Sequence, residues 1–237
     1  MKAFVLAAGR GERMRPLTDT TPKPLLAVRG KPLIVWHLEA LARGGVREVV
    51  INTAWLEERI VAALGDGAGF GLAIRYSLEG RDHGGALETA GGLKKALPLL
   101  QLVGDEPFWY VAADVFAPDF GFDALALQRA ARAPLLAHLW MVANPPQHSG
   151  GDFGIADGLA TAGGAGPRFT WSGIGAFRAA FVRDLMGDFE PGAKARMRPY
   201  LDAAIAARRL GAEFWPGDWA DVGTPERLAC LRGSGGT

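Results

Sequence analysis

The chain has 237 residues, of which 49% are hydrophobic and 22% charged, a composition that excludes an intrinsically disordered protein. Its formal net charge of +1 excludes a general attraction to nucleic acid or to an anionic membrane, so any bound anion needs a local cluster of charge. No apolar stretch reaches the about 20 residues that a membrane helix needs, and the single cysteine, Cys230, excludes an intrachain disulfide. We therefore expect a cytoplasmic protein without nucleic-acid or membrane partners, in which Cys230 is a small buried side chain.

The N-terminal half alternates short apolar segments with amphipathic ones. Strands are predicted at 3–7, 48–52, 72–76 and 108–112, and helices at 32–43, 56–64 and 87–97. This alternation is typical of an α/β protein whose parallel sheet is covered by helices on both faces. In such a sheet the ligand binds beyond the carboxyl ends of the strands. The unusual residues follow the four strands in turn: 9–13, Asn52, Glu79 and Asp114.

The second half has a less regular pattern. Its predicted elements are strands at 135–142, 169–177 and 213–221, a polar turn or hairpin at 150–158, a helix at 200–209 and a last helix from Thr224. Thr224 suits the N-cap of that helix, and Pro225 suits its first turn. No segment has the composition of a linker. We predict one domain over residues 1–232 and a flexible tail at 233–237.

The loop after the first strand combines glycines with arginines. Gly9 and Gly11 allow backbone amides to approach anionic oxygens, and Arg13 can bind a phosphate through two donors. Lys23 follows between two prolines, which stiffen the backbone that carries it. A Walker P-loop would need a Lys-Ser/Thr pair after the glycines, and a dinucleotide fingerprint would need a small residue in place of Arg13. The segment is therefore either a phosphate loop of another kind or a surface loop whose charges are solvated.

Two aspartates stand at the ends of predicted strands. Asp114 ends an apolar segment, and Asp221 lies between a strand and the capped last helix. Two carboxylates brought together could share Mg²⁺, which binds through one or two carboxylates plus substrate phosphates. Taken singly, Asp114 also suits a turn and Asp221 a position beside a helix cap. Both follow strands in a chain that has a candidate phosphate loop, which favours a metal site.

Together these segments resemble the sugar-1-phosphate nucleotidyltransferases. The resemblance rests on Leu-Ala-Ala-Gly-x-Gly-x-Arg-x-x-Pro-Leu-Thr from Leu6, on Thr21-Pro-Lys-Pro, on Asp114, and on Trp-x-Asp-Val-Gly-Thr-Pro-Glu-Arg-Leu from Trp219. Within that family, the segments similar to the N-acetylmuramate α-1-phosphate uridylyltransferases of cell-wall recycling are 52–56, 64–67 with 70–77, 87–92, 144–145 with 151–153, and 172–174. The resemblance implies a single-domain, Rossmann-like α/β fold of the GT-A-like kind, with a mostly parallel central sheet flanked by helices.

The resemblance also implies the activity and the residues that perform it. A nucleotidyl group, UMP from UTP, would pass to a sugar 1-phosphate, N-acetylmuramate α-1-phosphate, with Mg²⁺ as cofactor and the protein a monomer or weak dimer. The catalytic residues would be Arg13, Lys23, Asp114 and Asp221, and the two aspartates would bind the metal. The nucleoside triphosphate would be bound by Ala8, Gly9, Gly11, Arg13, Lys23, Asn52, Glu79, Leu87, Thr89 and Gly91. The sugar would be bound by Asn144, Asp152 and Ser172.

The chain departs from the family pattern at two places. Ala113 stands where the family usually has glycine, and residues 81–85 form a short insertion beside the predicted base site. Two alternatives remain: a guanylyl- or thymidylyltransferase acting on mannose or glucose 1-phosphate, and a non-catalytic nucleotide-sensing domain. The presence of Lys23 with both aspartates argues against the sensing domain. His148, in a polar loop, is open between a sugar contact and a solvated loop histidine.

Overall fold

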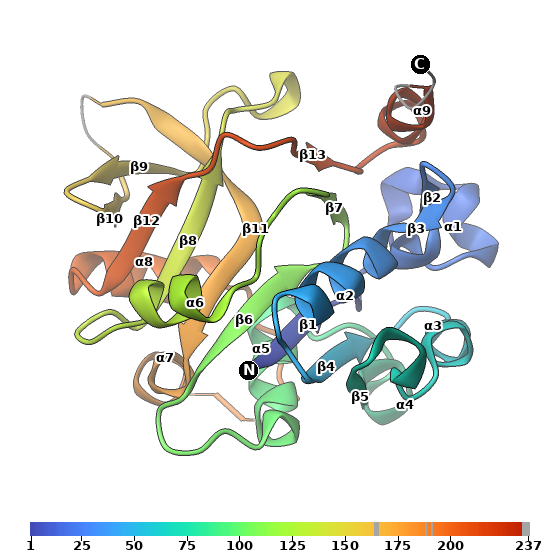
Figure 1. The fold of residues 1–237 in the computed structure, drawn as a ribbon, viewed down its shortest axis with the longest axis horizontal. Helices are drawn as coiled ribbons and strands as arrows, with labels where there is room; N and C mark the ends of the chain where they lie inside the picture. The colour runs from blue at the N-terminus through green and yellow to red at the C-terminus, as the bar shows by residue number, and fades with distance from the viewer. Residues whose placement is uncertain (164–165, 188, 191, 234–237) are drawn as a thin grey trace.

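The structure is a computed structural model, and it describes residues 1–163, 166–187, 189–190 and 192–233. Its centre is a nine-stranded sheet (Figure 1). In spatial order the strands are β5 (Ala73–Leu78), β4 (Glu48–Thr53), β1 (Lys2–Leu6), β6 (Pro107–Ala112), β11 (Arg168–Arg178), β8 (Ala137–Val142), β12 (Leu210–Phe214), β10 (Leu159–Thr161) and β9 (Phe153–Ala156).

The N-terminal half of the sheet is parallel, as the alternating pattern predicts. Strands β5, β4, β1 and β6 pair in parallel, and Leu6 lies in register with Asn52 and Ala112. Successive side chains of β1 enter different cores because a strand alternates its faces. Ala3 and Val5 pack in the core that includes α2 (Leu33–Arg43), and Phe4 packs in the core that includes α5 (Glu88–Leu100). The carboxyl ends of four strands therefore meet along one edge.

The second half makes the sheet mixed, so the prediction of a mostly parallel sheet is wrong there. Strand β11 runs antiparallel to β6 and to β8, and β10 runs antiparallel to β12 and to β9; only β8 and β12 are parallel among the described pairs of this half. Strands β8 and β11 are joined by a segment that folds back through the β9–β10 hairpin. Because an antiparallel pair needs no helical crossover, the chain can reverse its direction here.

The remaining elements are short. The helices are α1 (Leu17–Thr20), α3 (Glu57–Leu64), α4 (Glu79–His83), α6 (Ala124–Ala130), α7 (Ala179–Leu185), α8 (Arg198–Ala206) and α9 (Pro225–Gly233). The 3₁₀ turns are η1 (Glu12–Met14), η2 (Lys23–Leu25), η3 (Ala68–Phe70) and η4 (Pro146–His148), and the short strands are β2 (Ala27–Val28), β3 (Lys31–Pro32), β7 (Val115–Phe116) and β13 (Ala220–Asp221). No helix in the described part of the chain is long and apolar enough to cross a membrane.

Several predicted boundaries are wrong, each for a local reason. The strand predicted at 213–221 is split into the end of β12 and β13, because Pro216 has no N–H to donate to a ladder. The helix predicted at 200–209 ends at Ala206, where Arg208 turns the backbone with a φ of 54°. Cys230 is exposed on α9 rather than buried. The boundary predicted between the domain and the tail stays a prediction: Gly233 is the last residue of α9, and residues 234–237 lie outside the described residues.

The C-terminal strap, residues 215–233, brings the C-terminal part of the chain against its N-terminal part. It leaves β12, crosses the top of the view in Figure 1 and ends beside β2 and β3. Val222 and Leu228 are buried in a small core with Met14 and Leu33, and Arg232 Nε donates to the Ala27 carbonyl at 2.9 Å. The strap thereby brings residues from the end of the sequence onto the loop that follows β1.

Candidate active site

The two predicted metal ligands are brought together by a two-stranded ladder. Strand β13 pairs antiparallel with β7, so that Asp221 lies opposite Val115, the residue after Asp114. The Val222 amide donates to the Asp114 carbonyl at 3.2 Å. Both carboxylates line one cavity of about 270 Å³. Residues from the middle and from the end of the chain therefore share one edge of the sheet.

Lys23 lies against the first of these aspartates. Its Nζ donates to Asp114 Oδ2 at 2.7 Å, and its side chain is only 8% exposed because Pro22 and Pro24 hold η2 in the interior. Burial raises the pKa of Asp114, but the charge and the hydrogen bond of Lys23 outweigh burial and lower this pKa below its ordinary value. The Asp114 carboxylate is therefore ionised at neutral pH, as a metal ligand must be.

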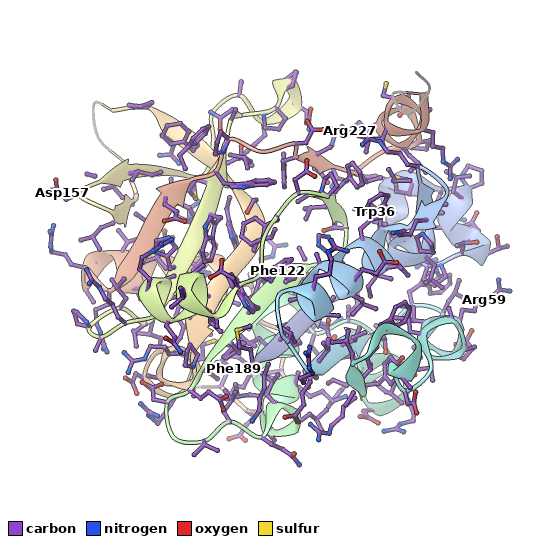
Figure 2. All side chains as sticks on the ribbon, viewed as in Figure 1. Trp36, Arg59, Phe122, Asp157, Phe189 and Arg227 are labelled. Carbon is purple, nitrogen blue, oxygen red and sulfur yellow. The ribbon has the colours of Figure 1, made fainter. Side chains whose placement is uncertain are left out.

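The second aspartate meets a cation of the strap. Arg227 Nη1 donates to Asp221 Oδ2 at 2.6 Å, and Arg227 is labelled in Figure 2. A Cβ at Gly223 would lie 2.7 Å from Arg227 Nη1 and 2.8 Å from Asp221 Oδ2, so a larger residue there would displace this pair from its present position. Among the described residues Asp221 Oδ1 accepts no hydrogen bond. One oxygen of this carboxylate is thus oriented by Arg227, and the other can reach a ligand.

The pair of aspartates suits a hard divalent cation that completes its shell with substrate. Within the described ranges no group of three or more His, Cys, Asp or Glu side chains could hold a metal by itself. Mg²⁺ is commonly bound by one or two carboxylates, with the other positions taken by water and substrate phosphates. The donor set of Asp114 and Asp221 therefore fits a metal that is held jointly by protein and nucleotide.

The glycine loop forms a second cavity beside the first. Gly11 has a φ of 67°, and a Cβ there would lie 3.1 Å from Lys23 Cβ, so the loop needs glycine at this position. Thr18 Oγ1 donates to the Gly11 carbonyl at 2.8 Å and closes the turn. The cavity has a volume of about 290 Å³, and its lining is Gly11, Glu12, Arg13, Met14, Lys23, Asp114 and Gly223. Arg13 is exposed there, whereas Ala8 is buried and Gly9 is exposed at the start of the loop.

The two cavities meet at Asp114, which lines both. The cavity over the glycine loop contains Arg13 and Lys23, as a phosphate site requires. The other cavity is lined in part by two aromatic side chains, Trp171 and Trp219, and by Gly173. This arrangement can hold a polyphosphate on one side of Asp114 and a sugar on the other.

Two of the predicted nucleotide ligands are buried in a structural network. Asn52 and Glu79 are both fully buried, and Asn52 Nδ2 donates to Glu79 Oε1 at 2.7 Å. Ala7 N donates to Asn52 Oδ1, and Leu87 N donates to Glu79 Oε2, each at 2.8 Å. Burial raises the pKa of Glu79 above its ordinary value, although the two donors to it oppose this. These side chains tie the end of β1 to the start of α5.

The start of α5 contacts the segment that precedes α8. Ala195 O accepts from the amide of Gly91 at 3.1 Å, and Thr89 Oγ1 accepts from Met197 N at 2.8 Å. A Cβ at Gly91 would lie 2.4 Å from the Ala193 carbonyl, so glycine permits this close approach. Leu87 is buried. That Leu87, Thr89 and Gly91 contact a nucleotide stays a prediction.

Of the three predicted sugar ligands, only Asp152 lines the cavity. Ser172 is fully buried, and its Oγ donates to the Trp140 carbonyl at 2.6 Å. Asn144 donates to two backbone carbonyls and accepts from Thr170 Oγ1 at 2.9 Å. Ser172 and Asn144 therefore shape the walls around the cavity and do not project into it.

Sequence reasoning missed the residues that complete the two cavities. The predicted site did not contain Trp219 and Gln147, which line the sugar-side cavity, or Arg227, which pairs with Asp221. Arg227 and Trp219 both stand in the Trp-x-Asp-Val-Gly-Thr-Pro-Glu-Arg segment, whose spacing around Asp221 was the available signal. Gln147 has no sequence signal, because its position depends on how the loop after β8 folds.

Comparison with known proteins agrees with this geometry. A family model described as nucleotidyl transferase matches residues 2–158. The N-acetylmuramate alpha-1-phosphate uridylyltransferase of Neisseria meningitidis is 47% identical over an alignment of 234 residues, and the alignment covers 96% of this chain and 95% of that protein. The chain belongs to the nucleotidyl transferase family. This confirms the family predicted from the motifs, and with it an enzyme that transfers a nucleotidyl group.

More distant members of the nucleotidyl transferase family match shorter parts of the chain. A glucose-1-phosphate thymidylyltransferase of Streptomyces griseus is 35% identical over 66% of this chain and 41% of its own length. A mannose-1-phosphate guanyltransferase of Candida albicans is 38% identical over 53% and 33%. A crystal structure of a Bacillus anthracis protein, described as a glucose-1-phosphate thymidylyltransferase, superposes with a TM-score of 0.79 at 20% identity, covering 99% of this chain and 95% of that one. The last match shows the shared fold.

The structure accommodates both departures from the family pattern. Ala113 is buried, donates its amide to the Leu6 carbonyl at 3.0 Å and is not among the residues with positive φ, so alanine fits there without strain. The insertion at 81–85 forms most of α4 and the turn after it. Lys95 Nζ donates to Asp82 Oδ2 at 2.7 Å, which attaches α4 to α5. The insertion is therefore held against α5.

Replacing Arg227 with methionine should weaken Mn²⁺ binding by about 10–100-fold, because Asp221 would lose the donor that orients it. Titration of the free protein with Mn²⁺, followed by electron paramagnetic resonance, measures this directly. Arg232→Met, on the same helix but bonded to the Ala27 carbonyl, should bind Mn²⁺ like the wild type. Tighter binding in Arg227→Met would mean that Arg227 competes with the metal for Asp221.

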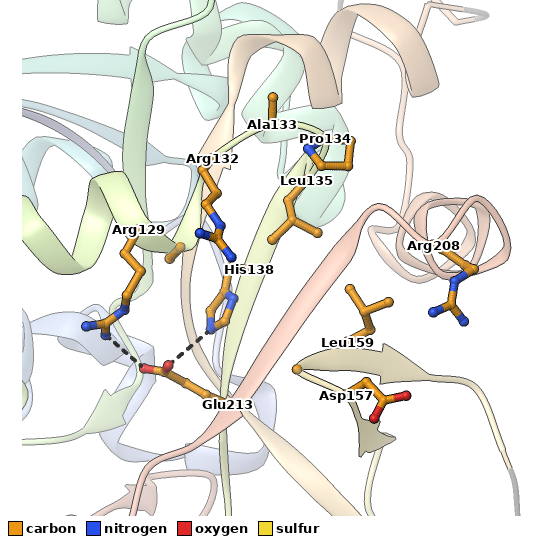
Figure 3. Close-up of a pocket in the computed structure, with 12 residues that line it drawn as sticks. Arg129, Arg132, Ala133, Pro134, Leu135, His138, Asp157, Leu159, Arg208 and Glu213 are labelled. Atoms are coloured by element: carbon orange, nitrogen blue, oxygen red, sulfur yellow. Dashed lines mark ion pairs between the residues drawn. The ribbon is translucent and has the colours of Figure 1, made fainter.

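A larger cavity, of about 400 Å³, lies away from these residues (Figure 3). Glu213 stands between Arg129 and His138 there: Arg129 Nη2 lies 3.9 Å from Glu213 Oε1, and His138 Nε2 lies 3.7 Å from Glu213 Oε2. Trp140 Nε1 also donates to Glu213 Oε1, at 2.5 Å. The charges of this cavity largely balance one another, and none of the predicted site residues lines it.

The histidine of this cavity should make stability depend on pH. Burial lowers the pKa of His138 from 6.5 to about 4, although Glu213 opposes this. Between pH 6.5 and pH 4 the unfolded chain takes up a proton on this histidine that the folded chain does not. The free energy of unfolding is therefore undiminished above pH 6.5 and falls as the pH drops toward 4. The loss is on the order of 3 kcal/mol. Urea unfolding at pH 7 and pH 5 should show a smaller drop for His138→Leu than for the wild type; an equal drop would contradict this assignment.

Proposed function

We propose that this chain transfers UMP from UTP to N-acetylmuramate α-1-phosphate and releases pyrophosphate. The observation that carries the proposal is the junction of two cavities at Asp114, one with Arg13 and Lys23 and the other lined by aromatic and polar residues. The choice of base and sugar is supported by the uridylyltransferase of Neisseria meningitidis, whose similarity extends over nearly the full length of both chains. The reaction would serve the recycling of peptidoglycan sugars in the cytoplasm.

The chemistry needs no general base from the protein. A sugar 1-phosphate is already an anion at neutral pH, so its oxygen attacks the α-phosphorus of UTP as the bond to pyrophosphate breaks in line. The buried ammonium of Lys23 offsets the charge that builds at the α-phosphorus, and Arg13 with the loop amides binds the departing pyrophosphate. The protein accelerates the reaction by positioning and by charge that is set in place before the reaction.

Mg²⁺ is the metal that we propose for Asp114 and Asp221. When bound, it would neutralise phosphate oxygens of the nucleotide as a Lewis acid. The chain's own contribution is to keep the Asp114 carboxylate ionised, through Lys23, and to orient the Asp221 carboxylate, through Arg227. We assign Asn52 and Glu79 to a supporting role, in which they hold the backbone of Ala7 and Leu87 near the nucleotide.

The wider predictions from the sequence stand as part of this proposal. We propose one GT-A-like domain over residues 1–232, and the continuous nine-stranded sheet supports it. We also propose that the protein acts as a monomer or weak dimer, with nucleoside triphosphate and sugar 1-phosphate as its partners. Light scattering at several protein concentrations tests the oligomeric state.

A pyrophosphate-release assay with Mg²⁺ tests the proposed function. UTP, GTP, dTTP and CTP are each combined with N-acetylmuramate, N-acetylglucosamine, glucose and mannose 1-phosphates. Turnover that is strong only with UTP and N-acetylmuramate 1-phosphate supports the proposal. Preference for GTP with mannose 1-phosphate, or dTTP with glucose 1-phosphate, would move the enzyme to another branch of the family. No turnover with any pair would favour a nucleotide-sensing role.

A further inference from the structure

The loop between β8 and β9, residues 143–152, is a firmly braced wall of the sugar-side cavity. Asn144 Nδ2 donates to the carbonyls of Ser149 and Arg168, each at 3.0 Å. Arg168 Nη2 donates to the Asp152 carbonyl at 2.6 Å, and its Nε donates to the Gly150 carbonyl at 3.1 Å. These bonds cross the loop from both sides, so the side chains that it presents are held in place before substrate arrives.

Glycine at position 151 allows the loop to close this tightly. Its φ is 59°, and a Cβ there would lie 2.8 Å from Asn144 Oδ1 and 2.9 Å from Phe169 N. The adjacent Asp152 amide donates to the Phe169 carbonyl at 2.7 Å, which joins the loop to β11. The loop is thus built into the sheet edge.

This wall presents a histidine and an aspartate that bond to each other. His148 Nε2 lies 3.0 Å from Asp152 Oδ1, and Trp171 N donates to Asp152 Oδ2 at 2.8 Å. The backbone amide holds the carboxylate, and the carboxylate holds one nitrogen of the ring. Both His148 and Asp152 line the cavity, and the imidazole is 44% exposed, so it remains open to a ligand.

The charges around this cavity restrict what can enter it. Its ionisable lining consists of the carboxylates of Asp114, Asp152 and Asp221 and the single imidazole of His148. The phosphate of a sugar 1-phosphate belongs at the Asp114 end, where Lys23, and the metal when bound, would offset its charge. A second anionic group on the sugar, far from the phosphate, would face carboxylates unless a cation met it. In this lining only His148 can carry that charge.

We propose that His148 determines specificity by binding the carboxylate of the sugar substrate. The inference rests on the proposed function, since N-acetylmuramate differs from N-acetylglucosamine by a lactyl ether that carries a carboxylate. His148 acts as an imidazolium between two carboxylates: Nε2–H donates to Asp152, and Nδ1–H donates to the substrate. Asp152 is then a positioning residue, because it fixes the ring without touching the lactyl group. Arg227 is less suited to this role because its guanidinium already pairs with Asp221 at 2.6 Å.

A cycle of two changes tests the proposal. Wild type and His148→Gln are each assayed with UTP and either N-acetylmuramate 1-phosphate or its lactyl carboxamide, which keeps the shape and removes the charge. A hydrogen bond between charged groups predicts that the carboxamide lowers wild-type kcat/KM by about 10–100-fold. His148→Gln should show a similar loss with the acid and almost no further loss with the carboxamide. If His148→Gln with the carboxamide instead shows the product of the loss from the variant and the loss from the carboxamide, His148 does not bind the carboxylate and the proposal is overturned.

Three further measurements separate the possible failures. His83→Gln makes the same substitution on α4, outside this lining, and should keep the wild-type discrimination between acid and carboxamide. An unchanged melting temperature in His148→Gln shows that the loop has stayed folded, and Asp152→Asn should reduce the discrimination while the ring itself remains. Wild type that ignores N-acetylmuramate 1-phosphate altogether would refute the proposed function and the inference with it. Normal use of this substrate with multiplying losses would refute the inference alone.

Discussion

Replacing Lys23 with methionine should lower kcat by about 10²–10³-fold while the protein remains folded. Methionine keeps much of the length of the buried side chain but removes the ammonium that lies 2.7 Å from Asp114 Oδ2. Two effects combine in the loss. The charge that forms at the α-phosphorus would have no fixed counter-charge, and the pKa of Asp114 would lose the influence that lowers it. Steady-state pyrophosphate release at saturating UTP and sugar phosphate measures the change.

A matched control distinguishes this local effect from a general loss of charge. Lys31→Met removes a lysine that pairs with Glu39 at 2.5 Å, away from both cavities, and should turn over like the wild type. Circular dichroism melting of both variants checks the fold. Near-normal kcat in Lys23→Met would remove Lys23 from the catalytic residues.

Replacing Asp221 with asparagine should abolish most activity, again by about 10²–10³-fold, and should also weaken Mn²⁺ binding in the free protein. Asparagine preserves the shape of the side chain, so the β7–β13 ladder should persist. It removes the negative charge that offsets Arg227 and that would bind the metal. Calorimetric titration with Mn²⁺ separates the loss of metal from the loss of chemistry.

Asp218→Asn is the control for this substitution. Asp218 lies on the same strap, three positions earlier, and is exposed, so the change of net charge is identical. Its activity and its Mn²⁺ affinity should match those of the wild type. If Asp221→Asn bound Mn²⁺ normally and turned over normally, the metal would have to be held without Asp221, and the two-aspartate site would be wrong.

The order of elements in the N-terminal half could be predicted from the sequence because its signals are local. Apolar strands such as β1 (Lys2–Leu6) alternate with helices whose apolar residues recur every three or four positions, and this pattern needs no knowledge of distant contacts. The glycine loop was equally readable, since a φ of 67° at Gly11 is a property of one residue and its neighbours. The second half was less readable because the direction of β11 depends on how the 143–167 segment folds back.

For the predicted nucleotide and sugar ligands, too, local sequence signals located the residues but not their contacts. Asn52 and Ser172 lie within strands and Glu79 follows one, and the structure buries all three side chains. A sequence reveals that a polar residue stands near a strand end, but not whether its partner is a ligand or another side chain. Asn52 and Glu79 bond to each other across two strands, a contact that only the packing of β4 against β5 creates.

By itself the sequence determined the family, the α/β class and the identity of the residues that carry charge: Arg13, Lys23, Asp114 and Asp221. These follow from short segments whose backbone and chemistry are set by adjacent residues. Only the tertiary structure decided which charges meet. The strap brings Arg227 to Asp221 and Asp221 beside Asp114, and the braced loop after β8 brings His148 to Asp152 at the cavity wall. Such pairs depend on where distant parts of the chain pack, because an ion pair or a hydrogen bond acts only over a few ångströms.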